Sequence, residues 1–244
     1  LTGHRLSESM GGVTKFGYSI FSFSQNAQLP QIYSGFGIDN IIFYKLYPVD
    51  TLKKSEFWWE SPDGTQALCS RLGPLARANF YFSFTIPAIL GGNALSNKDG
   101  SWQVRFTDGA KICRLIDDSF EHPHATELEQ DIRIRDEVIA EAVKSTIESA
   151  ACESFNKEVL LGFDGNDFTM PVAELPEPLS KANEVSDNIT FVHSTPLDYF
   201  AEFREKTDLT QLQVVGGEMR FGPLCRQHCE LMGTAIAIMH RLSQ

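Results

Sequence analysis

Short runs of apolar, β-branched and aromatic residues alternate along the chain with stretches in which apolar residues recur at helical spacing. The short runs are apolar on both faces, which is typical of strands that lie between layers of helices. They predict strands at residues 16–20, 41–46, 159–163, 189–192 and 212–215. Strands that alternate with helices favour an α/β fold with mainly parallel strands and flanking helices.

The clearest helical pattern covers residues 126–151. Its apolar residues form one stripe at helical spacing, made of Leu128, Ile132, Ile139, Val143 and Ile147. Shorter helices are predicted at residues 27–35, 174–184, 196–206 and 223–240. Residues 91–109 are rich in glycine, asparagine, aspartate and serine, which indicates long surface loops rather than a domain linker. We therefore expect a single α/β domain over residues 1–244.

Composition narrows the class of protein. The chain is 42% hydrophobic and 22% charged, as ordinary globular proteins are. Its formal net charge of -11 disfavours a nucleic-acid partner, because an acidic surface repels phosphate. No apolar stretch approaches about 18 residues, so no membrane-spanning helix is expected. The five cysteines are odd in number and scattered, which favours a reducing, cytoplasmic location over a disulfide framework.

Four segments carry recognisable motifs in a fixed order. They lie at residues 3–39, 57–65, 160–183 and 217–228, and their most specific parts read SFSQNAQLPQI, FWWESPDGT, GFDGNDF and GEMR. Together they resemble the N-terminal catalytic domain of glycoside hydrolase family 38, which includes α-mannosidases and mannosylglycerate hydrolases. The QNAQLPQI phrase is more similar to the bacterial, cytoplasmic branch of that family than to the secretory branch.

The resemblance implies a fold and a reaction. It implies an irregular, incomplete (β/α)7-barrel-like domain that lacks the first strand of the family's domain. It also implies hydrolysis of α-mannosides by a retaining, zinc-dependent glycosidase, with a mannosyl carbohydrate as substrate or ligand. Retention needs two carboxyl groups about 5–5.5 Å apart, one as nucleophile and one as acid/base. Zinc would serve as a Lewis acid and as a template that orients the sugar.

The motifs also imply site residues. Asp167, in the sequence GNDF, corresponds to the acid/base carboxyl group, and a raised pKa would let it protonate the leaving oxygen. The alternative is a loop aspartate that caps a turn, and Asp164 is the neighbour most easily confused with it. His228 corresponds to a zinc ligand, with a solvated helix histidine as the alternative.

The chain departs from the family pattern at the nucleophile. Phe21 stands where the motif has aspartate, and residues 17–31 contain no Asp or Glu at all. Ala235 falls where the family has arginine, and the upstream His-x-Asp pair of zinc ligands would precede Leu1. A lone imidazole does not hold zinc, so we expect no tight binding by this chain alone. Hydrolysis is expected to be impaired, and the alternative is a catalytically silent carbohydrate-binding or structural domain.

Two further groups of residues have alternative interpretations. Cys225, His228 and Cys229 share one helix face at i, i+3 and i+4, where they could bind zinc or pack in a core. Trp58 and Trp59 could stack on a sugar ring or belong to a core or loop. Nothing in the sequence indicates the linkage of the mannoside or the oligomeric state.

Overall fold

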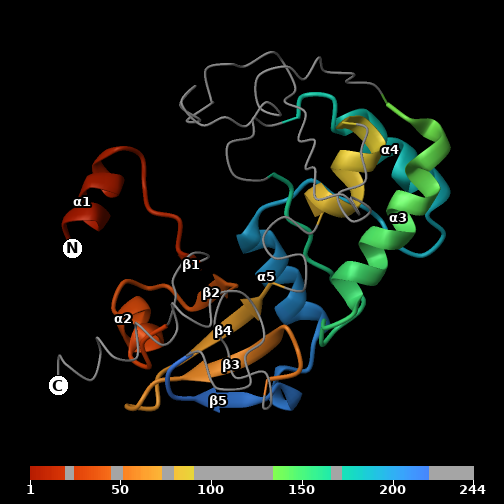
Figure 1. Cartoon of the computed structure of the whole chain (residues 1–244). Helices are drawn as coiled ribbons and strands as arrows, with labels where there is room; N and C mark the ends of the chain where they lie inside the picture. Colours follow the sequence, from red (N-terminus) through yellow and green to blue (C-terminus); the bar gives the residue numbers. More distant parts are fainter. Residues whose placement is uncertain (20–24, 45–51, 73–79, 91–133, 166–171, 220–244) are drawn as a thin grey trace, which may run out of the picture. The chain divides into compact units, whose positions relative to one another are not determined.

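The computed structural model describes residues 1–19, 25–44, 52–72, 80–90, 134–165 and 172–219 (Figure 1). The chain divides into two compact units. Unit 1 combines Leu1–Leu72 with Thr195–Gln244, and unit 2 is Gly73–Ser194. Each unit has its own cluster of buried apolar side chains. The single domain expected from the sequence stays a prediction.

Unit 1 is built on a mixed, mostly parallel sheet of five strands in the order β1-β2-β4-β3-β5. The strands are β1 (Gly17–Ser19), β2 (Asn40–Phe43), β3 (Glu56–Glu60), β4 (Gln66–Arg71) and β5 (Val214–Gly216). β1 pairs with β2, β2 with β4, and β3 with β5 in parallel, whereas β3 and β4 are antiparallel. The α/β fold with mainly parallel strands is therefore confirmed, while barrel closure stays a prediction.

The antiparallel pair β3–β4 is a hairpin closed by a tight turn. Ser61 N–H donates to Thr65 O at 2.8 Å, and Gly64 N–H donates to Ser61 O at 2.9 Å. Gly64 has a φ of +85°, a conformation that favours glycine. Both carboxylate oxygens of Asp63 accept bonds from Thr65. The turn lies in the motif segment at residues 57–65, whereas the two strands that it joins were not predicted from the sequence.

Helices cover both faces of the sheet. On one face, Leu29 and Tyr33 of α2 (Leu29–Ser34) pack against the buried cluster that contains Phe57 and Cys69. Adjacent strand residues point to opposite faces, so Ser70 lies on the other face. There its hydroxyl contacts Tyr199 of α5 (Pro196–Lys206). The sheet is thus sandwiched, as the two-sided apolar runs predicted.

Two short helical elements complete the described part of unit 1. They are α1 (Thr2–Ser9), none of whose residues is buried, and the 3-10 helix η5 (Leu209–Gln211). Neither was predicted from the sequence.

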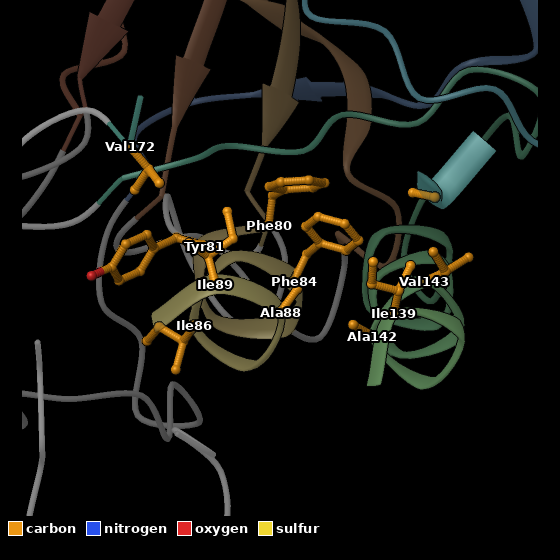
Figure 2. Close-up of a cluster of buried hydrophobic side chains, with 11 residues drawn as sticks. Phe80, Tyr81, Phe84, Ile86, Ala88, Ile89, Ile139, Ala142, Val143 and Val172 are labelled. Atoms are coloured by element: carbon orange, nitrogen blue, oxygen red, sulfur yellow. The ribbon is translucent and has the colours of Figure 1, made fainter. Parts of the chain in front are cut away.

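Unit 2 packs three helices around an aromatic core (Figure 2). They are the π-helix η2 (Tyr81–Leu90), α3 (Asp136–Ala151) and α4 (Pro176–Val185). Phe84 of η2 and Ile139 and Val143 of α3 belong to the buried cluster. These two α3 residues were part of the predicted apolar stripe, and the third, Ile147, packs against the same cluster.

The other predictions for secondary structure divide clearly. The helix at 196–206 has the predicted bounds, and the helix predicted at 27–35 is confirmed by α2. The helix predicted at 126–151 is confirmed from Asp136 onward, and residues 126–133 lie outside the described residues. The helix predicted at 174–184 is confirmed by α4, which ends one residue later. Strands are confirmed at 16–20, 41–46 and 212–215, but those at 159–163 and 189–192 are wrong. In the first run, Phe163 O accepts bonds from the N–H groups at the start of η2. In the second run, the backbone N–H and carbonyl of Phe191 bond to the Asn183 side chain. Neither set of backbone groups bonds to a neighbouring strand in the described part of the chain. The helix at 223–240 and the loops at 91–109 lie outside the described residues.

Within those described residues, no helix combines the length and the apolar character that crossing a membrane requires.

Candidate functional site

The three site residues identified by resemblance, Phe21, Asp167 and His228, lie outside the described residues. The structure does describe the residues that flank each of their segments. These flanking residues show how the scaffold of the site is built.

The segment that carries Phe21 is tied at both ends. It leaves β1 at Ser19 and rejoins the described chain at Gln25, whose side chain is buried. The Ser19 hydroxyl donates to Gln25 Oε1 at 3.2 Å, and Gln25 Nε2 donates to Ser19 O at 3.3 Å. Two bonds between one side chain and the residue at the end of β1 fix the distance across the segment.

Gln25 also pairs with the start of the segment that carries His228. Gln25 N–H donates to Met219 O at 2.9 Å, and Met219 N–H donates to Gln25 O at 3.0 Å. Met219 is completely buried and immediately precedes Arg220. The end of the segment that carries Phe21 and the start of the segment that carries His228 are therefore joined by this pair in unit 1.

Ser61 and Trp59 connect the motif segments to one another. The Ser61 hydroxyl donates to Ala27 O at 2.9 Å and accepts from Gln31 N–H at 3.0 Å. The indole N–H of Trp59 donates to Gly217 O at 2.8 Å. Three of the four segments with recognisable motifs thus form one hydrogen-bonded structure, which a single sequence does not reveal.

The two tryptophans are parts of the scaffold. Trp59 is completely buried, which confirms a core role over stacking on a sugar. The half-buried Trp58 donates its indole N–H to Leu209 O at 3.1 Å. The guanidinium of Arg204 lies over its ring, 5.6 Å from the ring centroid.

A buried polar cluster at the carboxyl end of β4 was missed by the sequence analysis. Glu56 Oε1 accepts from Tyr199 Oη at 3.1 Å and from Ser70 Oγ at 3.4 Å. Burial, and then the charge of Glu56, raise the pKa of Tyr199 well above its ordinary value. This edge of a parallel sheet is where α/β proteins usually bind ligands. All three side chains are buried, however, so the cluster supports the edge without meeting solvent.

In unit 2 the structure describes the approach to Asp167. The main chain reaches Asp164, whose Oδ1 accepts a bond of 2.6 Å from the Thr85 hydroxyl of η2. Asp164 keeps contact with solvent, yet the protein around its carboxyl group displaces enough water to raise its pKa. The bond from Thr85 and the nearby His193 act in the opposite direction. Asp164 is therefore an anchored carboxylate three positions before the candidate acid/base.

Comparison with known families settles the ancestry. The residue pattern of the glycosyl hydrolases family 38 N-terminal domain matches residues 1–220. The chain belongs to this family. The resemblance inferred from the four motif segments is confirmed, and the family 38 domain spans both compact units.

One solved structure supports the same fold. An α-mannosidase from Enterococcus faecalis V583 has a TM-score of 0.62 and 19% sequence identity, and the match covers 89% of this chain and 19% of that one. A second protein of family 38 from Enterococcus faecalis has a TM-score of 0.49 and 17% identity over 88% of this chain and 17% of its own. This family 38 domain therefore spans about a fifth of the first structure's length. A search of curated proteins found no match.

The candidate ligands named by the motif resemblance do not make up a zinc site of the family type. By the motif resemblance, Phe21 takes the place of an aspartate ligand, and it offers no oxygen, nitrogen or sulfur. His228 supplies one imidazole, whereas catalytic zinc sites have about three protein ligands. Within the described ranges, no group of three or more His, Cys, Asp or Glu side chains is placed to hold a metal ion.

Proposed function

We propose that this chain is a mannoside-directed domain of α-mannosidase ancestry in which hydrolysis is impaired by Phe21. Membership of family 38 supports the substrate class. The observation that carries the proposal is that the residues flanking the Phe21 segment are hydrogen-bonded to one another, while the segment itself lacks the expected carboxylate. Ser19, Gln25 and Met219 hold the ends of the segment, but the segment contains no carboxylate.

The chemistry explains why this position matters. A retaining glycosidase forms a bond between a carboxylate oxygen and the anomeric carbon while an acid protonates the leaving oxygen. In the proposal Asp167 keeps the second role, and a phenyl ring at position 21 has no lone pair for the first. Protonation without a nucleophile leaves the glycosyl–enzyme intermediate unformed, so the rate of double displacement falls.

A catalytically silent carbohydrate-binding or structural domain is the second candidate. The same substitution favours it, because losing the nucleophile removes turnover without filling the rest of a sugar site. The two candidates differ in whether any hydrolysis remains.

Binding and turnover measured on the same preparation test the proposal. Calorimetry with methyl α-mannoside is compared with methyl α-glucoside, and release of nitrophenol from 4-nitrophenyl α-mannoside is followed. We expect mannoside binding, weaker glucoside binding, and a slow hydrolysis that Asp167→Asn removes. Binding with no hydrolysis in either protein would favour the silent domain. Fast hydrolysis lost in Asp167→Asn would show that Phe21 is no impediment, and absence of mannoside binding would leave only a structural role.

A further inference from the structure

Within the described residues, α1 is attached to the rest of unit 1 mainly through His4. This residue is half-buried, whereas every other residue of the helix is exposed. The imidazole ring of His4 lies against the Phe36 ring, with 5.2 Å between the ring centroids. An isolated helix as short as α1 is marginal in water, so its order depends on contacts outside the helix.

Lys15 binds to both partners of this contact. Its ammonium nitrogen donates to Phe36 O at 3.0 Å and lies 3.3 Å from His4 Nε2. An ammonium group has no lone pair and can only donate, so Nε2 must be the acceptor of this second bond. The bond between Lys15 and His4 therefore exists only while the imidazole is neutral and carries its proton on Nδ1.

Glu8 offers the same ring nitrogen a second partner. Glu8 Oε1 lies 3.6 Å from His4 Nε2, too far for a hydrogen bond to a neutral ring but close enough for an ion pair with a protonated one. Glu8 belongs to α1 itself, whereas Lys15 and Phe36 lie outside the helix. Lys15 and Glu8 are the charged side chains that the described structure places against the imidazole. Protonation of His4 therefore opposes the contact outside the helix and favours the one within it.

The chain that follows α1 allows the helix to move. Gly11 and Gly12 have φ values of +122° and +128°, conformations that other residues rarely adopt. A Cβ added to either glycine would meet no other atom within 4 Å, so packing does not fix this turn. Two adjacent glycines in open surroundings are suited to act as a hinge between α1 and β1.

We propose that His4, Lys15 and Glu8 form a proton-operated latch, which holds α1 against Phe36 while the imidazole is neutral and releases the helix when the imidazole is protonated. In the neutral state the partner of Nε2 lies outside the helix, and in the protonated state it lies on the helix. The latch makes the attachment of α1, and not the sheet, depend on pH. It requires no assumption about hydrolysis or mannoside binding.

The tautomer of His4 gives the first test. In protein labelled with ¹⁵N at histidine, the chemical shifts of the two ring nitrogens show which of them carries the proton. His4→Gln assigns the signals among the six histidines. We expect the neutral ring to carry its proton on Nδ1, and the ring in Lys15→Met to lose this preference because the donor is gone. A proton on Nε2 of the neutral ring in the unmodified chain would overturn the inference.

Hydrogen exchange of the α1 amides gives the second test, measured from about pH 8 to about pH 5, the range in which imidazoles change charge. Each rate is compared with that of an unfolded peptide at the same pH, because exchange itself depends on pH. We expect protection of α1 to fall about fivefold as His4 becomes protonated, the usual effect of losing one hydrogen bond. In Lys15→Met protection should be low throughout this range.

Two further variants distinguish the latch from a general effect of acid. Glu8→Gln lacks the partner of the protonated ring, so the loss of protection should move to lower pH. Lys144→Met, at an exposed position of α3, is the control for removal of a lysine and should leave the loss of protection as it is. Protection of α1 that does not change with pH, or a pH dependence that survives unchanged in Lys15→Met, would overturn the inference.

Discussion

Gln25 and Met219 exchange both backbone hydrogen bonds, at 2.9 and 3.0 Å, although they stand near opposite ends of the described chain. Both side chains are buried. The pair joins the segment that follows β1 to the segment that follows β5, and these two segments carry Phe21 and His228. This pair therefore links, within unit 1, the two segments that the proposal assigns to the family site.

Replacing the Gln25 side chain should weaken this frame. Gln25→Ala removes both bonds to Ser19 and leaves the Ser19 carbonyl without that donor. We expect the free energy of unfolding to fall by about 1–3 kcal/mol. Urea unfolding followed by tryptophan fluorescence measures it. Gln28→Ala, at an exposed position in the same segment, is the control and should change stability by less than about 0.5 kcal/mol. Equal losses in the two variants would mean that the Gln25 side chain does not brace the segment.

The two tryptophans should differ sharply on substitution. Trp59→Phe leaves a space in a fully buried site and removes the donor to Gly217 O, so we expect a loss of about 2–4 kcal/mol. Trp58→Phe at its half-buried position removes the donor to Leu209 O and should cost about 1 kcal/mol. Urea unfolding of both variants, followed by circular dichroism, gives the comparison. A larger loss for Trp58→Phe than for Trp59→Phe would contradict the prediction that the buried Trp59, with its bond to Gly217 O, contributes more to stability.

The sequence predicted best the elements whose signals are local. The predicted bounds of α5 agree with the structure, in which a capping box of Thr195 and Asp198 marks its start locally. β1 and β2 were found because a short run of apolar residues is a sufficient signal for a strand buried on both faces. The same signal failed at residues 159–163, because an apolar run does not show whether a strand or a helix start will take its backbone groups.

For the candidate site, too, the sequence predicted some features and not others. Motif order identified the family and pointed to Asp167, Phe21 and His228 by position. The contacts that build the scaffold join residues far apart in the chain, as Ser61 does with Gln31 and Tyr199 with Glu56. Hydrophobic periodicity carries no information on such pairs, so a single sequence could not have predicted them.

Stability at alkaline pH should depend on Tyr199. Burial and the charge of Glu56 raise its pKa in the folded state above the unfolded value of about 10. The contribution of this phenol is therefore fully present below about pH 10 and is lost as the pH rises toward the folded pKa. Tyr199→Phe should cost about 1 kcal/mol at neutral pH, since Glu56 loses a donor.

The pH dependence distinguishes this effect from simple loss of packing. Above about pH 10 the free energy of unfolding should fall less steeply with pH in Tyr199→Phe than in the unmodified chain. The two slopes should differ by up to about 1.4 kcal/mol per pH unit. The measurement is urea unfolding at a series of pH values from about 8 to 11. Identical slopes for both proteins would show that Tyr199 does not titrate with unfolding. Tyr18→Phe, at a 50% exposed position, is the control for loss of a phenol at neutral pH.

Zinc content provides a test of the metal chemistry that does not depend on turnover. After dialysis against metal-free buffer, elemental analysis should find less than one zinc per chain, because His228 alone is too few ligands and Phe21 supplies none. One tightly held zinc per chain would contradict this expectation and point to Cys225, His228 and Cys229, which are spaced at i, i+3 and i+4 in the sequence. Replacing both cysteines by serine would then release the metal if they bind it, since thiolates are stronger zinc ligands than hydroxyls. Retention of zinc in that double variant would instead place the metal on a ligand set that neither the family motif nor this cysteine pair supplies.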